Sequence, residues 1–215
     1  MEILRPYRAL SAPAHLPLTQ TVSALKLRKD KQLTTEFCHR KRLDREEYCV
    51  DKSKRRMIEG WIDKAENQLK TAKDHLKSHY WCSESIEASQ ECVELSVKSV
   101  LSLLEIEYSL SHGWNKEEFS RIAKQIQEKQ LLDRLKAQNL YHSSRLPRLL
   151  LIANFWAQFY LPAKYGFETG NLAPAQDLFT VQEAELAAQH AEECYRAASE
   201  LRYLGEDKLA VVVRT

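Results

Sequence analysis

Glycine and proline are scarce in this chain, and their scarcity sets the first limit on the fold. The 215 residues include only five glycines and six prolines. So few turn formers favour a handful of long helices over many short strands joined by tight turns. A chain of this length can bury a hydrophobic core without cross-links.

Cysteine is also sparse and provides no framework for cross-linking. The five cysteines are an odd number and contain no CxxC pair, which argues against a disulfide scaffold. Cys38, His39 and Cys49 come nearest to a zinc-binding set, but a fourth ligand at normal spacing is missing. We therefore expect neither a metal nor another cofactor.

Long apolar runs are missing as well. The longest, from Leu146 to Tyr160, is broken by Pro147, Arg148 and Asn154, and it is shorter than the roughly 20 residues that a membrane span needs. The N-terminal residues are interrupted by prolines and arginines and lack the continuous apolar stretch of a secretory signal. We expect a cytoplasmic protein without a membrane partner.

Basic residues are concentrated at the N-terminal end. Residues 1–56 hold 14 Lys/Arg and 7 Asp/Glu, and residues 57–215 hold 18 and 23, so the net charges are +7 and −5. Such an arm can attract nucleic acid, an acidic partner or an anionic membrane, or it can simply stay solvated. We interpret residues 1–56 as a basic, partly disordered extension, 57–205 as a helical domain and 206–215 as a tail.

Apolar residues recur at steps of three and four from Met57 onward, which predicts amphipathic helices. We expect helices over about 57–76, 83–108, from Asn115 onward, over 144–160, and from Thr180 to Gly205. The fourth of them should be the most buried. Five helices with short connections predict an all-α, up-and-down antiparallel bundle. The alanines of the last helix suit either close packing in that bundle or a dimer seam.

Two helix starts have capping sequences. Asn115 and Thr180 can each accept from a first-turn amide, while Glu118 and Glu183 can reach back to the capping residue. Pro147 stands in the first turn of the fourth helix, where its missing amide hydrogen costs nothing.

Short motifs in a fixed order carry a resemblance to a known family. They are Trp61-Ile-Asp-Lys-Ala-Glu-Asn-Gln-Leu69, then Ala88-Ser-Gln-Glu-Cys-Val-Glu-Leu-Ser-Val-Lys98, then Leu104-Glu-Ile-Glu-Tyr108 with Ser111-His112. Over residues 57–204 the chain resembles the HEPN family, with Leu104 in place of the usual glycine. No Walker loop, GxGxxG run, HExxH or nucleophile elbow is present in the sequence.

The resemblance implies a helical bundle that handles RNA or a nucleotide, often encoded beside a small nucleotidyltransferase as in toxin–antitoxin pairs. Ribonuclease members carry an arginine, four to six residues and a histidine on a late helix, where the pair faces one phosphodiester across a dimer groove. Histidine can move the 2′-hydroxyl proton, and arginine can stabilise the phosphorane charge.

That spacing does not occur in the predicted bundle. Arg8 and His15 match it but lie in the extension, and Arg134 and His142 have seven residues between them. Arg134 and His142 are therefore weak candidates for a catalytic pair.

Four other residues are candidates for binding RNA or a nucleotide. Arg145 and Arg148 flank Pro147 at the positive end of a helix, which suits a phosphate, although pairing with carboxylates is the alternative. Lys164 and Tyr165, expected in the loop after that helix, can hold a phosphate and stack on a base, or merely anchor the loop.

The leading hypothesis is a HEPN protein that binds RNA or a nucleotide as a homodimer, partnered with a small nucleotidyltransferase in a toxin–antitoxin-like pair. Whether it cleaves RNA is left open. The alternatives are an active metal-independent ribonuclease toxin that uses Arg134 and His142, and a non-catalytic helical interaction scaffold.

Overall fold

The computed structural model describes residues 52–78, 80–167 and 173–213, without the side chains of residues 206 and 207. The chain divides into two units, Met1–Val50 and Asp51–Thr215, and every described residue belongs to the second. The predictions for the basic extension, for Arg8 with His15, and for Cys38, His39 and Cys49 lie outside the described residues.

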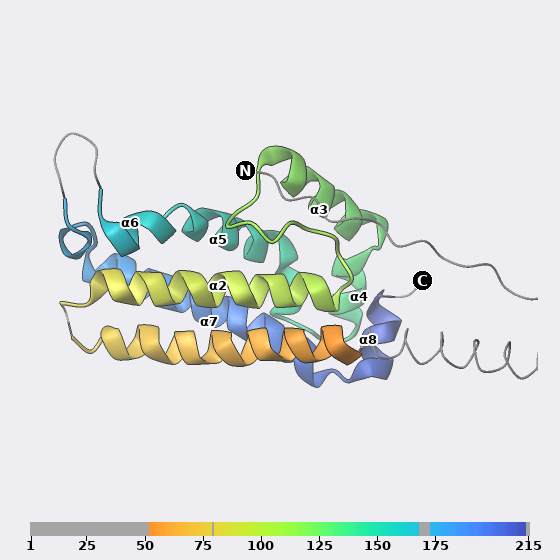
Figure 1. Ribbon diagram of the computed structural model, residues 1–215. Coiled ribbons are helices and arrows are strands. Elements are labelled where there is room, and N and C mark those ends of the chain that lie inside the picture. Colours follow the sequence, from red (N-terminus) through yellow and green to blue (C-terminus); the bar gives the residue numbers. More distant parts are fainter. Residues whose placement is uncertain (1–51, 79, 168–172, 214–215) are drawn as a thin grey trace, which may run out of the picture. The chain divides into compact units, whose positions relative to one another are not determined.

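Four long helices form an up-and-down bundle: residues 52–75, α2 (Cys82–Leu103), α5 (Leu146–Ala157) and α7 (Val181–Tyr203). The first of them runs beside α2 and α7 (Figure 1). Two contacts show that it runs antiparallel to α2: Ser85 Oγ donates to the carbonyl of Ala72, and Gln68 donates to Glu91. The all-α bundle predicted from the sequence is confirmed.

The first helix is already formed at residue 52, within the charge run that precedes Met57. Arg55 fixes this extra turn: its Nε lies 3.2 Å from Glu59 Oε1, and its Nη2 donates to the carbonyl of Arg202 at 3.1 Å. Charged residues carry little apolar periodicity, so the pattern alone places the start at least five residues too late.

Helix α2 is the centre of the core. Seventeen of its 22 residues are buried, including the serines that face α7 and the first helix. The expectation that the fourth helix is the most buried was wrong, because Leu151 and Phe155 of α5 are 63% and 48% exposed.

Helix α2 ends at Leu103, five residues earlier than predicted. Leu104 is the C-cap, and Glu105 follows with a φ of 52°, in the left-handed region. The amide of Ile106 then donates to the carbonyl of Leu101 at 2.9 Å, and Glu105 donates to Ser102 at 3.2 Å. This is a Schellman end with glutamate in the position that glycine usually takes.

An excursion made of α3 (Lys116–Glu128), α4 (Leu131–Ala137) and the 3-10 helix η1 (Ser143–Arg145) leads into α5. Asn115 caps α3 as predicted, accepting from the amide of Glu118 at 2.9 Å. The carboxylate of Glu118 does not reach back to Asn115, because it accepts from the amide and the hydroxyl of Ser109 in the connection from α2.

The predicted loop after the fourth helix contains more helix than expected. Helix α6 (Tyr160–Tyr165) follows α5, then come an isolated antiparallel bridge between Phe167 and Ala173 and the 3-10 helix η2 (Ala175–Asp177). Residues expected in a C-terminal tail form α8 (Glu206–Val213), in which Val212 and Val213 are buried.

The alanines of α7 were considered for either close packing within the bundle or a dimer seam. Thr180 and Glu183 form the predicted capping box at its start. Its inward alanines are almost fully buried, and Cys92 of α2 donates to the carbonyl of Ala191. The small side chains thus serve close packing within the bundle. Among the helices of the described region, none is long and apolar enough to cross a bilayer.

Candidate functional site

Arg145 and Arg148 converge on one carboxylate at the start of α5. Arg145 is the N-cap, and Pro147 stands in the first turn as predicted. Arg145 Nη1 lies 2.9 Å from Glu193 Oε1 on α7, and Arg148 Nε donates to both oxygens of Glu193 at 2.8 and 3.0 Å. The hydrogen bond from Arg148, more than any other contact, holds the pKa of Glu193 below its ordinary value.

This pairing leaves an excess of positive charge and unused donors. Two guanidinium groups share one carboxylate, and each guanidinium offers five N–H donors. The side chains of Arg145 and Arg148 are 39% and 43% exposed, whereas that of Glu193 is 13% exposed. The arginines are therefore both held in place and accessible to a second anion.

An exposed aromatic ring lies beside the arginines. Tyr141 is 67% exposed, and the Arg145 guanidinium carbon lies 5.8 Å from the centre of its ring. The segment that carries Tyr141 is fixed by Glu200 of α7, which accepts from the amides of His142 and Ser143 at 3.2 and 2.9 Å. A ring next to a cation in a fixed position suits a base and its phosphate.

His190 of α7 adds an imidazole to the same surface. Its Nδ1 accepts from Trp156 Nε1 at 3.0 Å. Partial burial, followed by the charge of Arg148, lowers the pKa of His190, so the ring is neutral at pH 7. A neutral ring whose Nδ1 accepts must carry its proton on Nε2. We call Tyr141, Arg145, Arg148, His190 and Glu193 the arginine site.

The weak catalytic pair is not joined by any contact within the described ranges. Arg134 Nη1 donates to the carbonyl of Val212 in α8 at 3.3 Å. His142 packs edge-on against Tyr141 at 5.3 Å, and its Nδ1 is enclosed with no hydrogen-bond partner in the described part of the chain. Their catalytic role stays a prediction.

Lys164 and Tyr165 lie apart from the arginine site, on α6 and not in a loop. Lys164 Nζ sits 5.5 Å from the ring centre of Tyr160, 5.7 Å from that of Tyr165, and 3.7 Å from Glu87 on α2. Tyr165 is 68% exposed. The contact with Glu87 and Tyr160 fits the anchoring alternative, and the binding role stays a prediction.

A second polar cluster serves to hold the connection after α2. Lys98 Nζ lies 2.6 Å from Glu94, an intrahelical pair, and donates to the carbonyl of Leu110 at 2.7 Å. His112 Nδ1 lies 2.7 Å from Glu94, and the imidazole stacks on Tyr160 at 4.8 Å. Each of these groups has a partner within the fold, which fits a structural role.

Sequence reasoning found both arginines and missed their surroundings. Glu193 and His190 are ordinary polar positions on the outer side of an alanine-rich helix, 45 and 42 residues from Arg148. The sequence contained one usable signal, the adjacent Tyr141 and His142 just before a proline-marked helix start.

Architecture and site together place this chain among the up-and-down all-α bundle domains with a basic surface site. A family model of the HEPN domain matches residues 58–202, and the chain belongs to this family. The match begins at the first core residue of the first helix and ends in the last turn of α7. Neither the curated proteins nor the solved structures compared with the chain give a match.

Proposed function

We propose that this HEPN protein binds RNA or a nucleotide at the arginine site and does so without cleaving it. The observation that supports the proposal is the pair of partly exposed guanidinium groups, Arg145 and Arg148, beside an exposed Tyr141. Guanidinium groups suit phosphate because their paired N–H groups match its oxygens, and the tyrosine offers a stacking surface for a base.

The state of His190 favours binding over cleavage. A general base for the 2′-hydroxyl needs an unprotonated nitrogen directed at the substrate. Trp156 occupies Nδ1, so Nε2 carries the proton and can only donate, for example to a phosphate oxygen. The imidazole would then hold the ligand as a third donor beside Arg145 and Arg148.

The same proposal includes a homodimer that forms next to this site. Leu151 and Phe155 lie four residues apart on one side of α5 and are 63% and 48% exposed. Leu151 follows Arg148 by three residues, so a seam on this side would adjoin the arginines. Dimers are common in this family. A cytoplasmic location and a small nucleotidyltransferase partner, as in toxin–antitoxin pairs, rest on the resemblance alone.

The test measures binding of a fluorescently labelled single-stranded RNA at several salt concentrations. Replacing Arg145 and Arg148 together by glutamine should weaken binding and reduce the slope of log affinity against log salt by about 1.4, at about 0.7 for each phosphate contact. Arg121→Gln is the matched control: this exposed arginine pairs with Glu118 on α3, a helix that contributes no residue to the arginine site, and should leave the slope unchanged.

A gain of binding separates this proposal from a structural role for the arginines. Glu193→Gln keeps the shape but removes the negative charge that competes with a phosphate. It should tighten RNA binding while it lowers the stability of the fold. If Glu193→Gln weakens binding, or the double variant binds like the wild type, the arginine site is not where RNA binds.

Cleavage is tested with the same protein on mixed RNA, with and without a chelator. We expect intact RNA in both. Chelator-resistant cleavage that is lost in His142→Ala would establish the alternative of a metal-independent ribonuclease using Arg134 and His142, and the same loss in His190→Ala would contradict the proton assignment.

A further inference from the structure

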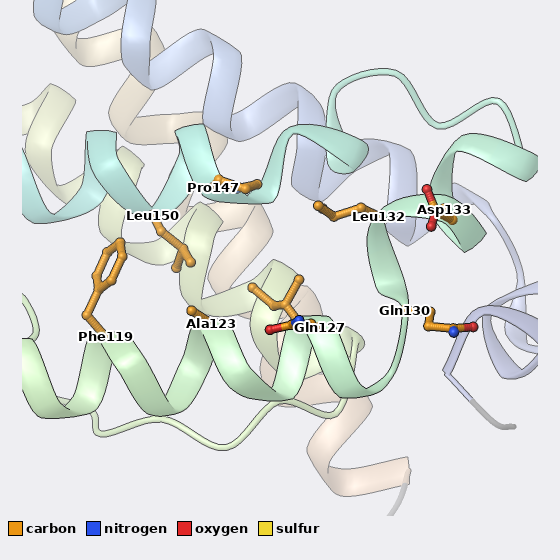
Figure 2. Close-up of a pocket in the computed structure, with 9 residues that line it drawn as sticks. Phe119, Ala123, Gln127, Gln130, Leu132, Asp133, Pro147 and Leu150 are labelled. Carbon is orange, nitrogen blue, oxygen red and sulfur yellow. The ribbon is translucent and has the colours of Figure 1, made fainter.

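A groove opens between α3, α4 and the start of α5, on a different side of α5 from the arginine site. Its volume is about 540 Å³, within the range of roughly 300–1,000 Å³ typical of small-molecule sites. Figure 2 shows the side chains of the three helices that surround this space. The lining residues are Phe119, Ala123, Ile126, Gln127, Gln130, Leu132, Asp133, Pro147 and Leu150.

The groove has an apolar end and a polar end. Phe119, Ala123 and Leu150 lie together at one end, while Gln130 and Asp133 lie at the other (Figure 2). Gln130 has a φ of 50° at the joint between α3 and α4, and this left-handed turn separates the two helices that form the walls. A ligand that fills the groove must therefore be apolar at one end and polar at the other.

The charge at the polar end has one sign. Asp133 is the only ionisable residue that lines the groove, and it makes no ion pair with any residue in the described ranges. Three cations lie within four residues of Asp133. Lys129 donates to the carbonyl of Glu105, Arg134 donates to that of Val212, and Lys136 does not line the groove. The groove therefore favours a cation over an anion.

We propose that this groove binds a small amphipathic cation, an aromatic or aliphatic body carrying a protonated amine or amidine. The body lies against Phe119 and Leu150, and the cationic head lies at Asp133, at the polar end of the groove. The site is independent of RNA binding, because the groove disfavours the phosphate that the arginine site selects.

The probe is 2-phenylethylammonium, titrated into the full-length protein and followed through backbone amide NMR signals. It should shift signals of residues 119–133 and 147–150. Neutral 2-phenylethanol should bind about 2- to 5-fold more weakly, as expected for one exposed ion pair, and phenylacetate should not bind.

Three variants complete the test. Asp133→Asn should reduce the affinity for the cation to that for the alcohol. Ala123→Phe fills the groove from an exposed helix position and should abolish binding of both, with the fold retained. Glu117→Gln, on the same helix but outside the groove, should change nothing. Equal binding of the cation and the alcohol, unchanged affinity in Asp133→Asn, or shifts confined to other helices would each overturn the proposal.

Discussion

At the scale of single residues, the arginine site shows what a sequence can and cannot identify. Pro147 marks a helix start, and that made Arg145 and Arg148 recognisable as candidates for binding an anion. The alternative considered for them, pairing with a carboxylate, is also realised, through Glu193. Both features coexist because one carboxylate cannot neutralise two guanidinium groups. Only the fold brings Glu193 to them.

Trp156→Phe should raise the pKa of His190, because the indole N–H that opposes a proton on Nδ1 is removed. Groups facing the imidazole are Trp156 and Arg148 from α5 and Glu193 from its own helix. In the wild type the folded-state pKa lies below the ordinary 6.5, so the unfolded chain takes up the proton first as the pH falls. As the pH is lowered from about 6.5 to the folded-state pKa, the free energy of unfolding should therefore decrease.

Over that pH range the free energy of unfolding should decrease less in the variant than in the wild type. The variant should also be less stable at every pH, because its ring is smaller. The measurement is the pH titration of the His190 Cε1–H signal, together with urea unfolding at each pH. Trp114→Phe is the control, because Trp114 is also buried but its indole N–H donates to the carbonyl of Ser109 and not to His190. An unchanged His190 titration in Trp156→Phe would show that the indole does not fix the ring proton.

At the scale of elements, apolar periodicity located every long helix, and two of the errors fall at ends set by backbone conformation. The end of α2 was predicted too late because Ile106 and Tyr108 continue the apolar pattern beyond Glu105, where the chain has already turned. Glutamate gives no signal for the left-handed region. Gln130 breaks α3 from α4 in the same way, with a φ of 50°. By contrast, the helix starts at Asn115 and Thr180 were predicted correctly, because capping side chains have distinctive chemistry.

Glu105→Gly should therefore stabilise the protein, by about 1 kcal/mol, since glycine enters the left-handed region without the cost that other residues incur. The side chain of Glu105 is exposed, and the hydrogen bond from Lys129 goes to its backbone carbonyl, which the substitution keeps. Urea unfolding measures the change. Lys124→Gly, at an exposed position inside α3, should instead destabilise by roughly 1 kcal/mol. A loss of stability in Glu105→Gly would mean that this residue is not left-handed in solution.

At the scale of the whole molecule, the fold class followed from the sequence because helical periodicity over residues 57–204 leaves no other way to bury the apolar faces. The core extends from Ile58 to Val213, so the last helix, expected as a tail, contributes to it. Its short apolar run, Leu209 to Val213, was too brief to be distinguished from an unstructured end. The groove also escaped prediction, since it arises only where α3, α4 and α5 meet.

A chain shortened to residues 51–215 should unfold with the same free energy as the full chain, because the core of the described residues lies wholly within the second unit. A chain begun at Met57 should be less stable by about 1 kcal/mol, since it loses the first turn and the Arg55 contacts with Glu59 and the Arg202 carbonyl.

RNA binding at low salt then separates the two basic regions. The 51–215 chain should retain binding that depends on Arg145 and Arg148, while the full chain shows the steeper salt dependence because of its additional Lys and Arg. Binding by the full chain alone would assign RNA to the basic arm and remove it from the bundle.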